Sequence, residues 1–216
     1  MSNPGFAPPA PASLSLGMVG NCAFSALIDP HGRVVWSCLP RFDGDPVFHD
    51  LLGGDEAEQG AFAIEIEGLA EATQRYEPNT AVLVTELWDH DGNGLSITDF
   101  APRFLSRGRY FRPTQLVRRV RPLKGAPRIR VSLLPRFDWG RSAPTITSGS
   151  NHIRYVGDGQ TLRLHTDASI SHVLSRAPFL LMREHNFIFG PDETLDSGIG
   201  DTARHFEQET IAYWRN

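Results

Sequence analysis

The pentapeptide Leu-Pro-Arg-Phe-Asp occurs twice, at residues 39–43 and again at residues 134–138. Each copy places an arginine, an aromatic ring and a carboxylate together, and these groups can bind a ligand or one another. A duplicated unit would repeat its neighbourhood, yet VWSC precedes the first copy and RVSL the second. We therefore interpret the repeat as convergence on a strand exit. Proline ends the sheet pairing, phenylalanine packs back, and arginine and aspartate enter a loop. Which copy contacts a ligand, if either does, stays open.

Residues 89–94 read DHDGNG and match the opening of an EF-hand calcium loop. An EF-hand needs a bidentate glutamate at its twelfth position and a helix on either side. The twelfth residue here is Phe100, and the flanking segments alternate as strands do. We interpret the segment as a hairpin turn, in which Asp, Asn and Gly tolerate positive φ.

No other sequence pattern assembles a reactive site. The eight histidines lack the spacing of a zinc site. The segment 198–200 lacks the third glycine of a nucleotide-binding turn, and no G-x-S-x-G elbow is present. A pair of carboxylates can hydrolyse a glycosidic bond, but Glu65 and Glu67 fall on the polar side of an expected strand. The sequence therefore indicates no catalytic residue, no metal site and no cofactor.

Residues 103–130 are strongly basic, with nine arginines, one lysine and no Asp or Glu. Such a segment could bind an anion or an acidic partner. The basic residues alternate with apolar ones within 115–121 and 128–134, so we expect most of them on strands, paired with acids elsewhere. The net charge of −4 argues against a nucleic-acid-binding protein.

The chain has 216 residues, enough for one large domain. No apolar run approaches the ~20 residues that span a bilayer. The start, MSNPGFAPPAPAS, lacks the basic and apolar regions of a secretion signal. We expect a flexible tail at 1–13 and a cytoplasmic protein without a membrane partner. Cys22 and Cys38 could form a bridge across two strands, but reduced thiols fit the cytoplasm better.

Strand patterns dominate the chain. Residues 61–67 alternate apolar and polar side chains, as a half-buried strand does. Turn sequences at 29–32, 89–94 and 157–159 join neighbouring strands into hairpins. This short, regular spacing favours an all-β fold, an antiparallel β-sandwich, over βαβ units. The expected strands are 24–29, 33–39, 61–67, 81–88, 95–100, 115–121, 128–134, 152–156, 161–165, 170–174, 179–184 and 186–190.

Two segments have a helical pattern. Residues 46–52 could form a short helix after the first hairpin. A second helix begins at Asp201, the expected N-cap, and its apolar face carries Ala203, Phe206, Thr210 and Tyr213. It ends on Tyr213 and Trp214 without glycine, proline or a polar tail, so we expect a fragment that precedes another domain. The expected division is a tail at 1–13, a β-sandwich at 14–200 and a linker helix at 201–216.

Six motifs occur in a fixed order: GNCAFSALID (20–29), HGRVVWSCLPRFD (31–43), YEPNT (76–80), ITDFAP (97–102), VRRV (117–120) and PRFDWG (135–140). Together with residues 209–214 they resemble the N-terminal domain of bacterial glycoside hydrolase family 15 proteins, the glucoamylase-like and trehalase-like enzymes. The resemblance covers nearly the whole chain after the tail. It departs where Gly44-Asp45 replaces the family's usual serine after the first copy.

The resemblance implies a β-supersandwich joined to a C-terminal (α/α) barrel of the same polypeptide. In the family, two barrel glutamates hydrolyse α-glucosidic bonds with inversion. No barrel segment is found here, so no catalytic residue can be carried over. The domain is expected to pack on the barrel, support it and wall one side of its sugar pocket. Whether the substrate is a starch-derived chain, trehalose or another glucoside stays open.

The loop 41–46 is expected to project towards that sugar pocket. Arg41 and Asp43 would then hydrogen-bond hydroxyl groups of a glucose-containing oligosaccharide, with Trp36 or Phe42 as an apolar platform. The alternative, an Arg41–Asp43 network that fixes the loop, is equally open.

Two other classes compete with a supporting domain. A self-standing sugar-binding module would need an exposed aromatic strip on one sheet. An enzyme of the mutarotase kind would need a histidine and a carboxylate that converge in a concave face. A sandwich without its barrel would also expose an apolar face, so a homo-oligomer is possible.

Overall fold

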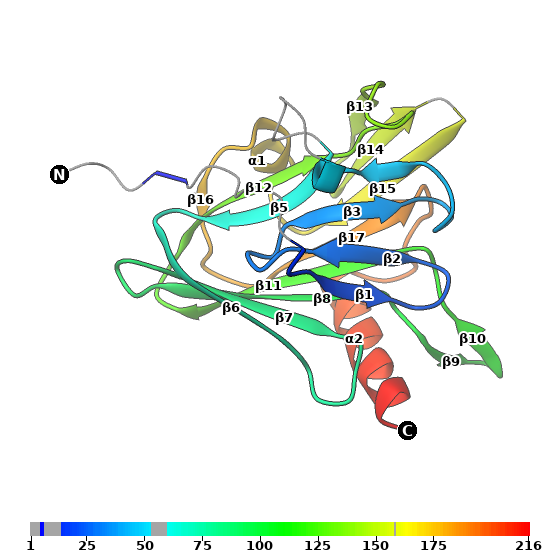
Figure 1. Cartoon of the computed structure of the whole chain (residues 1–216), viewed down its shortest axis with the longest axis horizontal. Coiled ribbons are helices and arrows are strands. Elements are labelled where there is room, and N and C mark those ends of the chain that lie inside the picture. The colour runs from blue at the N-terminus through cyan, green and yellow to red at the C-terminus, as the bar shows by residue number, and fades with distance from the viewer. Residues whose placement is uncertain (1–4, 7–13, 53–59, 158) are drawn as a thin grey trace.

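Residues 5–6, 14–52, 60–157 and 159–216 are described by a computed structural model. Two antiparallel sheets face each other, and the longer helix crosses the outer side of the second sheet (Figure 1). The expected all-β sandwich with a helix at its C-terminal end is confirmed. In the described part of the chain, no helix has the length and apolar character needed to cross a membrane.

Sheet A contains the N-terminal hairpin and has the strand order β1-β2-β3-β5-β12-β16, with β4 paired to β3. Its strands are β1 (Gly17–Gly20), β2 (Ser25–Ile28), β3 (Val34–Cys38), β4 (Pro46–Phe48), β5 (Ala61–Ile66), β12 (Arg128–Leu134) and β16 (Phe179–Leu180).

Sheet B has the strand order β13-β14-β15-β17-β11-β8-β7-β6. Its strands are β6 (Leu69–Tyr76), β7 (Leu83–Asp89), β8 (Gly94–Phe100), β11 (Leu116–Lys124), β13 (Thr145–Ser148), β14 (His152–Gly157), β15 (Gln160–Thr166) and β17 (His185–Pro191). A separate hairpin, β9 (Phe104–Ser106) with β10 (Arg109–Phe111), leaves the body beside the helix (Figure 1). The remaining elements are a 3-10 turn, η1 (Asp50–Leu52), and two helices, α1 (Ile170–Ser175) and α2 (Ile199–Arg215).

The core lies between the sheets and is rich in phenylalanine. The rings of Phe48 and Phe62 on sheet A contact those of Phe187 and Phe189 on sheet B, with centroids 5.3–6.4 Å apart. Each of these strands turns alternate side chains inward, so the two apolar faces bury each other. Burial of these aromatic faces is what holds the two sheets together.

One buried arginine links the sheets through polar contacts. Arg118 on β11 forms an ion pair with Asp99 on β8, with Nε 2.8 Å from Oδ1 and both side chains fully buried. It also donates to the carbonyl oxygens of Phe62 and Gly32, which belong to sheet A and its first hairpin. Because a buried charge is tolerated only when it is paired, this network fixes how the sheets face each other.

The edge strands of the two sheets meet at a tyrosine. The hydroxyl of Tyr76 on β6 accepts a hydrogen bond from the backbone N–H of Met18 on β1, at 2.8 Å. The same hydroxyl donates to the Met18 carbonyl at 2.9 Å. This pair of bonds joins the end of sheet B to the outermost strand of sheet A.

Helix α2 packs on sheet B on the side opposite the core. Ile199 and Ala203 lie against Val117 and Ile188 of β11 and β17. The Arg119 guanidinium adds ion pairs to Glu184, before β17, and to Glu207 of α2. The N-cap is Gly198, so the predicted N-cap Asp201 is wrong; it lies in the first turn. The apolar spacing from residue 199 already fits the helix, which starts where Gly198 ends the preceding loop.

One strand prediction is also wrong. Residues 170–174 form α1 instead of a strand, because Val173 alone is buried and Arg176 closes the turn in the left-handed conformation. The short helix expected within 46–52 is confirmed only for its last turn, the 3-10 helix η1, because residues 46–48 form β4 and pair with β3. Five strands of the structure were not predicted: β1, β6, β9, β10 and β13. The predicted tail at 1–13 lies largely outside the described residues.

Candidate functional site

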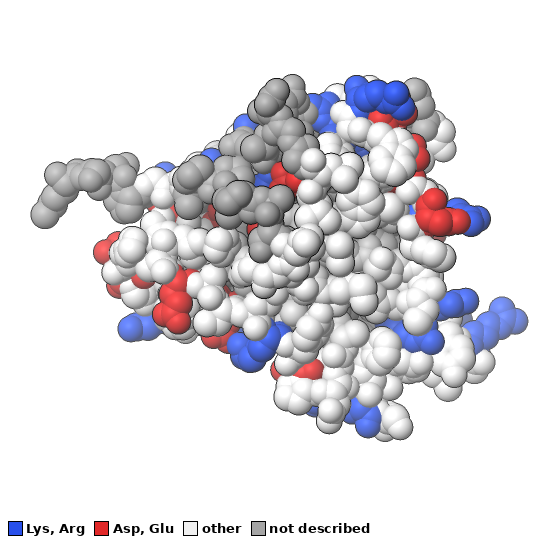
Figure 2. All heavy atoms as spheres, in the orientation of Figure 1, with Lys and Arg blue, Asp and Glu red and all other residues white. Residues whose placement is uncertain are grey.

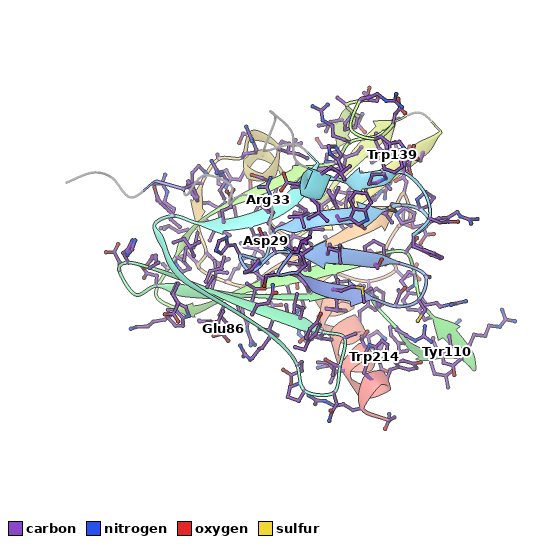
Figure 3. All side chains as sticks on the ribbon, in the orientation of Figure 1. Asp29, Arg33, Glu86, Tyr110, Trp139 and Trp214 are labelled. Atoms are coloured by element: carbon purple, nitrogen blue, oxygen red, sulfur yellow. The ribbon has the colours of Figure 1, made fainter. Side chains whose placement is uncertain are left out.

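Several of the motif segments meet at the C-terminal end of α2. There a cleft of about 400 Å³ is lined by two strands of sheet A, the first Leu-Pro-Arg-Phe-Asp loop and the helix end. We call it the helix-end cleft; its lining residues are Met18, Gly20, Cys22, Phe24, Ser25, Phe42, Ala81 and Trp214. Figure 3 shows Trp214 at the end of α2 and Tyr110 on the neighbouring hairpin. The lining is mostly apolar, which suits an apolar or aromatic contact.

Arg103 holds the end of α2 beside this cleft. Its guanidinium lies over the rings of Tyr213 and Tyr110, 5.0 and 5.5 Å from their centroids. Its Nη1 donates to the Asn21 carbonyl at 2.6 Å, and its backbone N–H donates to the Thr210 hydroxyl at 3.1 Å. One residue thus connects α2, the β9–β10 hairpin and the β1–β2 loop.

Asn21 shapes the β1–β2 loop. Its side-chain amide donates to the carbonyl oxygens of Pro102 and Pro113, at 2.9 and 2.7 Å. Its Oδ1 accepts from the backbone N–H groups of Ala23 and Phe24. These bonds hold Cys22 at a φ of 67° and leave it exposed, whereas Cys38 is buried, and both cysteines are free thiols. Sequence reasoning missed Asn21 because its partners lie far along the chain.

Arg41 and Asp43 of the first copy bind each other. The guanidinium Nε and Nη2 lie 2.9 and 2.8 Å from the two carboxylate oxygens, and the side chains are 75% and 50% exposed. The hydrogen bond from Arg41 lowers the pKa of Asp43. Phe42 between them is 67% exposed and lines the helix-end cleft. Trp36 is half-buried on β3 and does not line this cleft.

The second copy has a different environment. Phe137 is buried in the core, as predicted, and Asp138 pairs with Arg141 at 2.7 Å. For the first copy the predicted inward packing is wrong, because Leu39 and Phe48 already fill the core beside β3. The two copies therefore share five letters but not one geometry.

Four of the nine arginines in the basic segment form ion pairs within the fold. Besides Arg118 and Arg119, Arg128 pairs with Glu67 at 3.2 Å and Arg130 with Glu65 at 2.8 Å. The prediction of strand arginines paired with acids is confirmed for these four. Three further arginines, on and beside the β9–β10 hairpin, stay exposed: Arg107, Arg109 and Arg112.

The calcium-like segment is a hairpin turn, as predicted. Asp89 Oδ1 accepts from the backbone N–H groups of Asp91 and Asn93, at 2.9 and 2.8 Å, and β7 pairs with β8 on either side. Within the described ranges, no three His, Cys, Asp or Glu side chains are grouped as metal ligands.

A histidine and a carboxylate do meet where β17 begins. His185 Nδ1 lies 3.4 Å from Asp167 Oδ1. The Asn186 amide and backbone N–H also donate to this carboxylate, at 2.9 and 2.8 Å. Burial raises the pKa of Asp167, but the bonds from His185 and Asn186 outweigh it and leave that pKa lowered. A carboxylate held by three donors is suited to fixing a loop.

The comparisons with known proteins agree on one family. The model described as "Trehalase-like, N-terminal" matches residues 9–175. The trehalase 1 of Sulfolobus acidocaldarius is 28% identical over 211 residues, which are 93% of this chain and 34% of that protein. The trehalase of Thermoplasma volcanium is 28% identical over 153 residues, 70% of this chain and 24% of its own. The trehalase of Mycolicibacterium smegmatis is also 28% identical, over 63% of this chain and 22% of its own. The chain thus spans at most about a third of the length of these relatives.

Proposed function

Because this chain belongs to the trehalase-like N-terminal domain family, we propose that it is the supporting, non-catalytic domain of a glycoside hydrolase of family 15. Its partner would be a C-terminal (α/α) barrel that hydrolyses α-glucosidic bonds with inversion. The observation that carries the proposal is the match over 93% of this chain and only 34% of a trehalase. The remaining two thirds of such a protein would hold the catalytic glutamates.

The domain would support the barrel through α2. The helix is fixed to sheet B by apolar packing, by Arg119 and by the Arg103–Tyr213 contact. It would therefore hold the catalytic domain in a fixed orientation relative to the sandwich. Arg215 in its last turn also donates to Glu77 and to the Pro78 carbonyl, at 2.7 and 3.2 Å. A helix held at both ends gives a stiff connection instead of a free linker.

The Arg41–Asp43 loop is the part of the domain that we propose reaches the sugar pocket. Its support is exposure: the pair and Phe42 project from the body, and charged groups already paired can still donate to or accept from hydroxyl groups. In the complete enzyme, Arg41→Ala would raise KM for the glucoside about 3–10-fold, the range expected for one hydrogen bond.

The matched control is Arg141→Ala. Arg141 forms an equivalent pair with Asp138 in the second copy, with side chains 73% and 57% exposed. We expect it to leave kcat and KM unchanged. Unchanged constants for Arg41→Ala as well would remove the substrate role and leave a pair that only fixes the loop.

A self-standing sugar-binding module is the second candidate. The exposed aromatic residues Phe42, Tyr110 and Trp139 favour it, but Tyr110 and Trp139 lie at different ends of the molecule (Figure 3). Titration calorimetry of the 216-residue chain with trehalose and maltooligosaccharides separates the two. Binding at millimolar concentration or tighter would support the module, and its absence would support the supporting domain.

A further inference from the structure

The outer side of sheet A is apolar near its first strands. In the register of the sheet, Met18 of β1 pairs with Leu27 of β2, which pairs with Trp36 of β3. The neighbouring residues Val19 and Ala26 are fully buried in the core, so these three side chains project outwards. A solvated sheet face is normally polar. Figure 2 shows instead an uncharged surface over β1–β3, with charged side chains at its margins.

This row continues into the helix-end cleft. Met18 belongs to both, and it is 57% exposed. Phe42, with 67% of its surface exposed, and Trp214 of α2 also line the cleft. Sheet A, a loop and the end of α2 therefore form one apolar surface. We call it the docking face and define it as Met18, Leu27, Trp36, Phe42 and Trp214.

We propose that the docking face binds the catalytic domain that follows α2 in the same polypeptide, so this inference rests on the proposed function. The place where α2 ends supports that occupant. Trp214 lies in the cleft and Arg215 is bonded to the β6–β7 turn, so a chain that continues past residue 216 leaves beside the docking face. The matched relatives have about two thirds or more of their length outside the aligned part.

The composition of the docking face fits a domain interface. Aromatic residues and methionine are enriched at the centre of such interfaces, and charged residues are depleted. Trp214 Nε1 is buried and has no acceptor among the residues that the structure describes. Such a donor is expected where the final neighbours of a side chain include another domain.

The exposed arginines define the expected chemistry of the partner. Arg107, Arg109 and Arg112 lie on or beside the β9–β10 hairpin, next to the end of α2. The matching surface of the catalytic domain should therefore have apolar side chains at its centre and acidic side chains opposite this hairpin.

Hydrogen exchange on the complete polypeptide tests the proposal. We expect the loops at 20–24 and 39–45 to exchange about tenfold more slowly in the complete polypeptide than in the chain that ends at Asn216. Met18→Asp should return these loops to the exchange rates of the shorter chain, because it places a charge in the apolar contact.

Leu180→Asp is the matched control. Leu180 is 55% exposed and lies on β16, at the opposite edge of the same sheet. We expect this variant to keep the protection of both loops. Each variant is also made in the 216-residue chain, where an unchanged midpoint of thermal unfolding shows that the domain still folds.

Hydrolysis of an α-glucoside by the complete polypeptide separates the two proposals. Activity together with equal loop exchange in both polypeptides, or with no effect of Met18→Asp, overturns the docking face and keeps the proposed function. Absence of activity towards any glucoside overturns the proposed function and the docking face with it. If the loop protection in the complete polypeptide depends on protein concentration, a second copy is the occupant, and this result also overturns the proposal.

Discussion

At the scale of single residues, Arg118 links the two sheets through a buried polar network. Its ion pair with Asp99 is fully buried; burial raises the pKa of Asp99, and the nearby guanidinium opposes that change. Arg118→Met leaves the carboxyl without its partner, so we expect the free energy of unfolding to fall by about 3–5 kcal/mol. Urea denaturation measures the change.

The double variant, Asp99→Leu with Arg118→Met, is the control for Arg118→Met. It removes both buried charges and should recover part of the loss, because no unpaired charge then remains. If the free energy of unfolding of Arg118→Met lies within about 1 kcal/mol of that of the parent protein, the ion pair is dispensable for stability.

We expect His165 to make the stability of the protein sensitive to mild acid. Burial lowers its pKa, while the hydrogen bond from Nε2 to the Glu193 carbonyl acts in the opposite direction. The unfolded chain, with a histidine pKa of about 6.5, therefore binds a proton that the folded chain resists. We expect the free energy of unfolding to be highest above pH 7 and to fall as the pH drops through 6.5.

His165→Gln should flatten this pH dependence in urea denaturation between pH 5 and pH 8. The charged or titratable neighbours Arg163, His152 and Asp192 are kept in the variant. The pKa of Asp192 is lowered by its bonds from Arg154 and Arg163, so its own contribution is lost only in stronger acid. An identical pH profile in the variant would assign the sensitivity to another group.

Residue roles could be predicted from sequence only where the partners are local. The Asp89 turn could be predicted from the sequence because the backbone partners of Asp89 follow within four residues. Arg118 was visible as part of a motif but not as a buried residue, because Asp99 and Phe62 approach it only in the folded sandwich. The same is true of Asn21, whose partners lie 81 and 92 residues away.

At the scale of elements, the turn after the second Leu-Pro-Arg-Phe-Asp copy depends on Gly140. Its φ is +88°, and a Cβ atom there would lie 2.6 Å from His49 Nε2. Gly108 in the β9–β10 turn has a φ of +75° but open space around it. Gly108→Ala should therefore lower the free energy of unfolding by about 1 kcal/mol, through backbone strain alone. Gly140→Ala should lower the free energy of unfolding by at least about 1 kcal/mol more than Gly108→Ala does, because the His49 ring has to move.

Urea denaturation of these two variants isolates the steric part, since both glycines have positive φ. If both variants lose the same free energy of unfolding, the His49 ring moves aside without an energetic penalty. His49 also lies against Gly60, where a Cβ would come within 2.7 Å, so the ring has little room.

Strands could be predicted from the sequence where one face of the strand is buried and the other is exposed. β5 alternates and was found, since its inner face enters the core. β6 is mostly polar and β13 is exposed along its whole length, so neither has an apolar period to detect. Helix α1 has six residues, too few for a helical period to differ from a strand.

At the scale of the whole molecule, the apolar docking face should make the 216-residue chain self-associate. Exposed apolar patches of this kind favour contact between copies. We expect sedimentation velocity to show a weight-average mass that rises with concentration, and Met18→Asp to reduce the rise. Leu180→Asp should leave the rise of the weight-average mass with concentration unchanged. A monomer at every concentration would contradict the prediction.

The order of the strands in each sheet was beyond the sequence pattern. Hairpins are local and could be placed, but pairings such as β11 with β17 and β5 with β12 join strands far apart in the chain. The strand spacing already favoured a sandwich, and the resemblance to a known family implied a β-supersandwich. It could not indicate that several of its motif segments meet at the end of α2.

We expect the contact between Tyr76 and Met18 to hinder polymerisation through β1. β1 is the outermost strand of sheet A, and an unpaired outermost strand can recruit a strand from another chain and start a fibril. Here a phenol hydroxyl occupies both the N–H and the carbonyl of Met18. Strand addition at this position would first have to displace that side chain, so the sandwich can carry an apolar surface without offering a template for amyloid growth beside it.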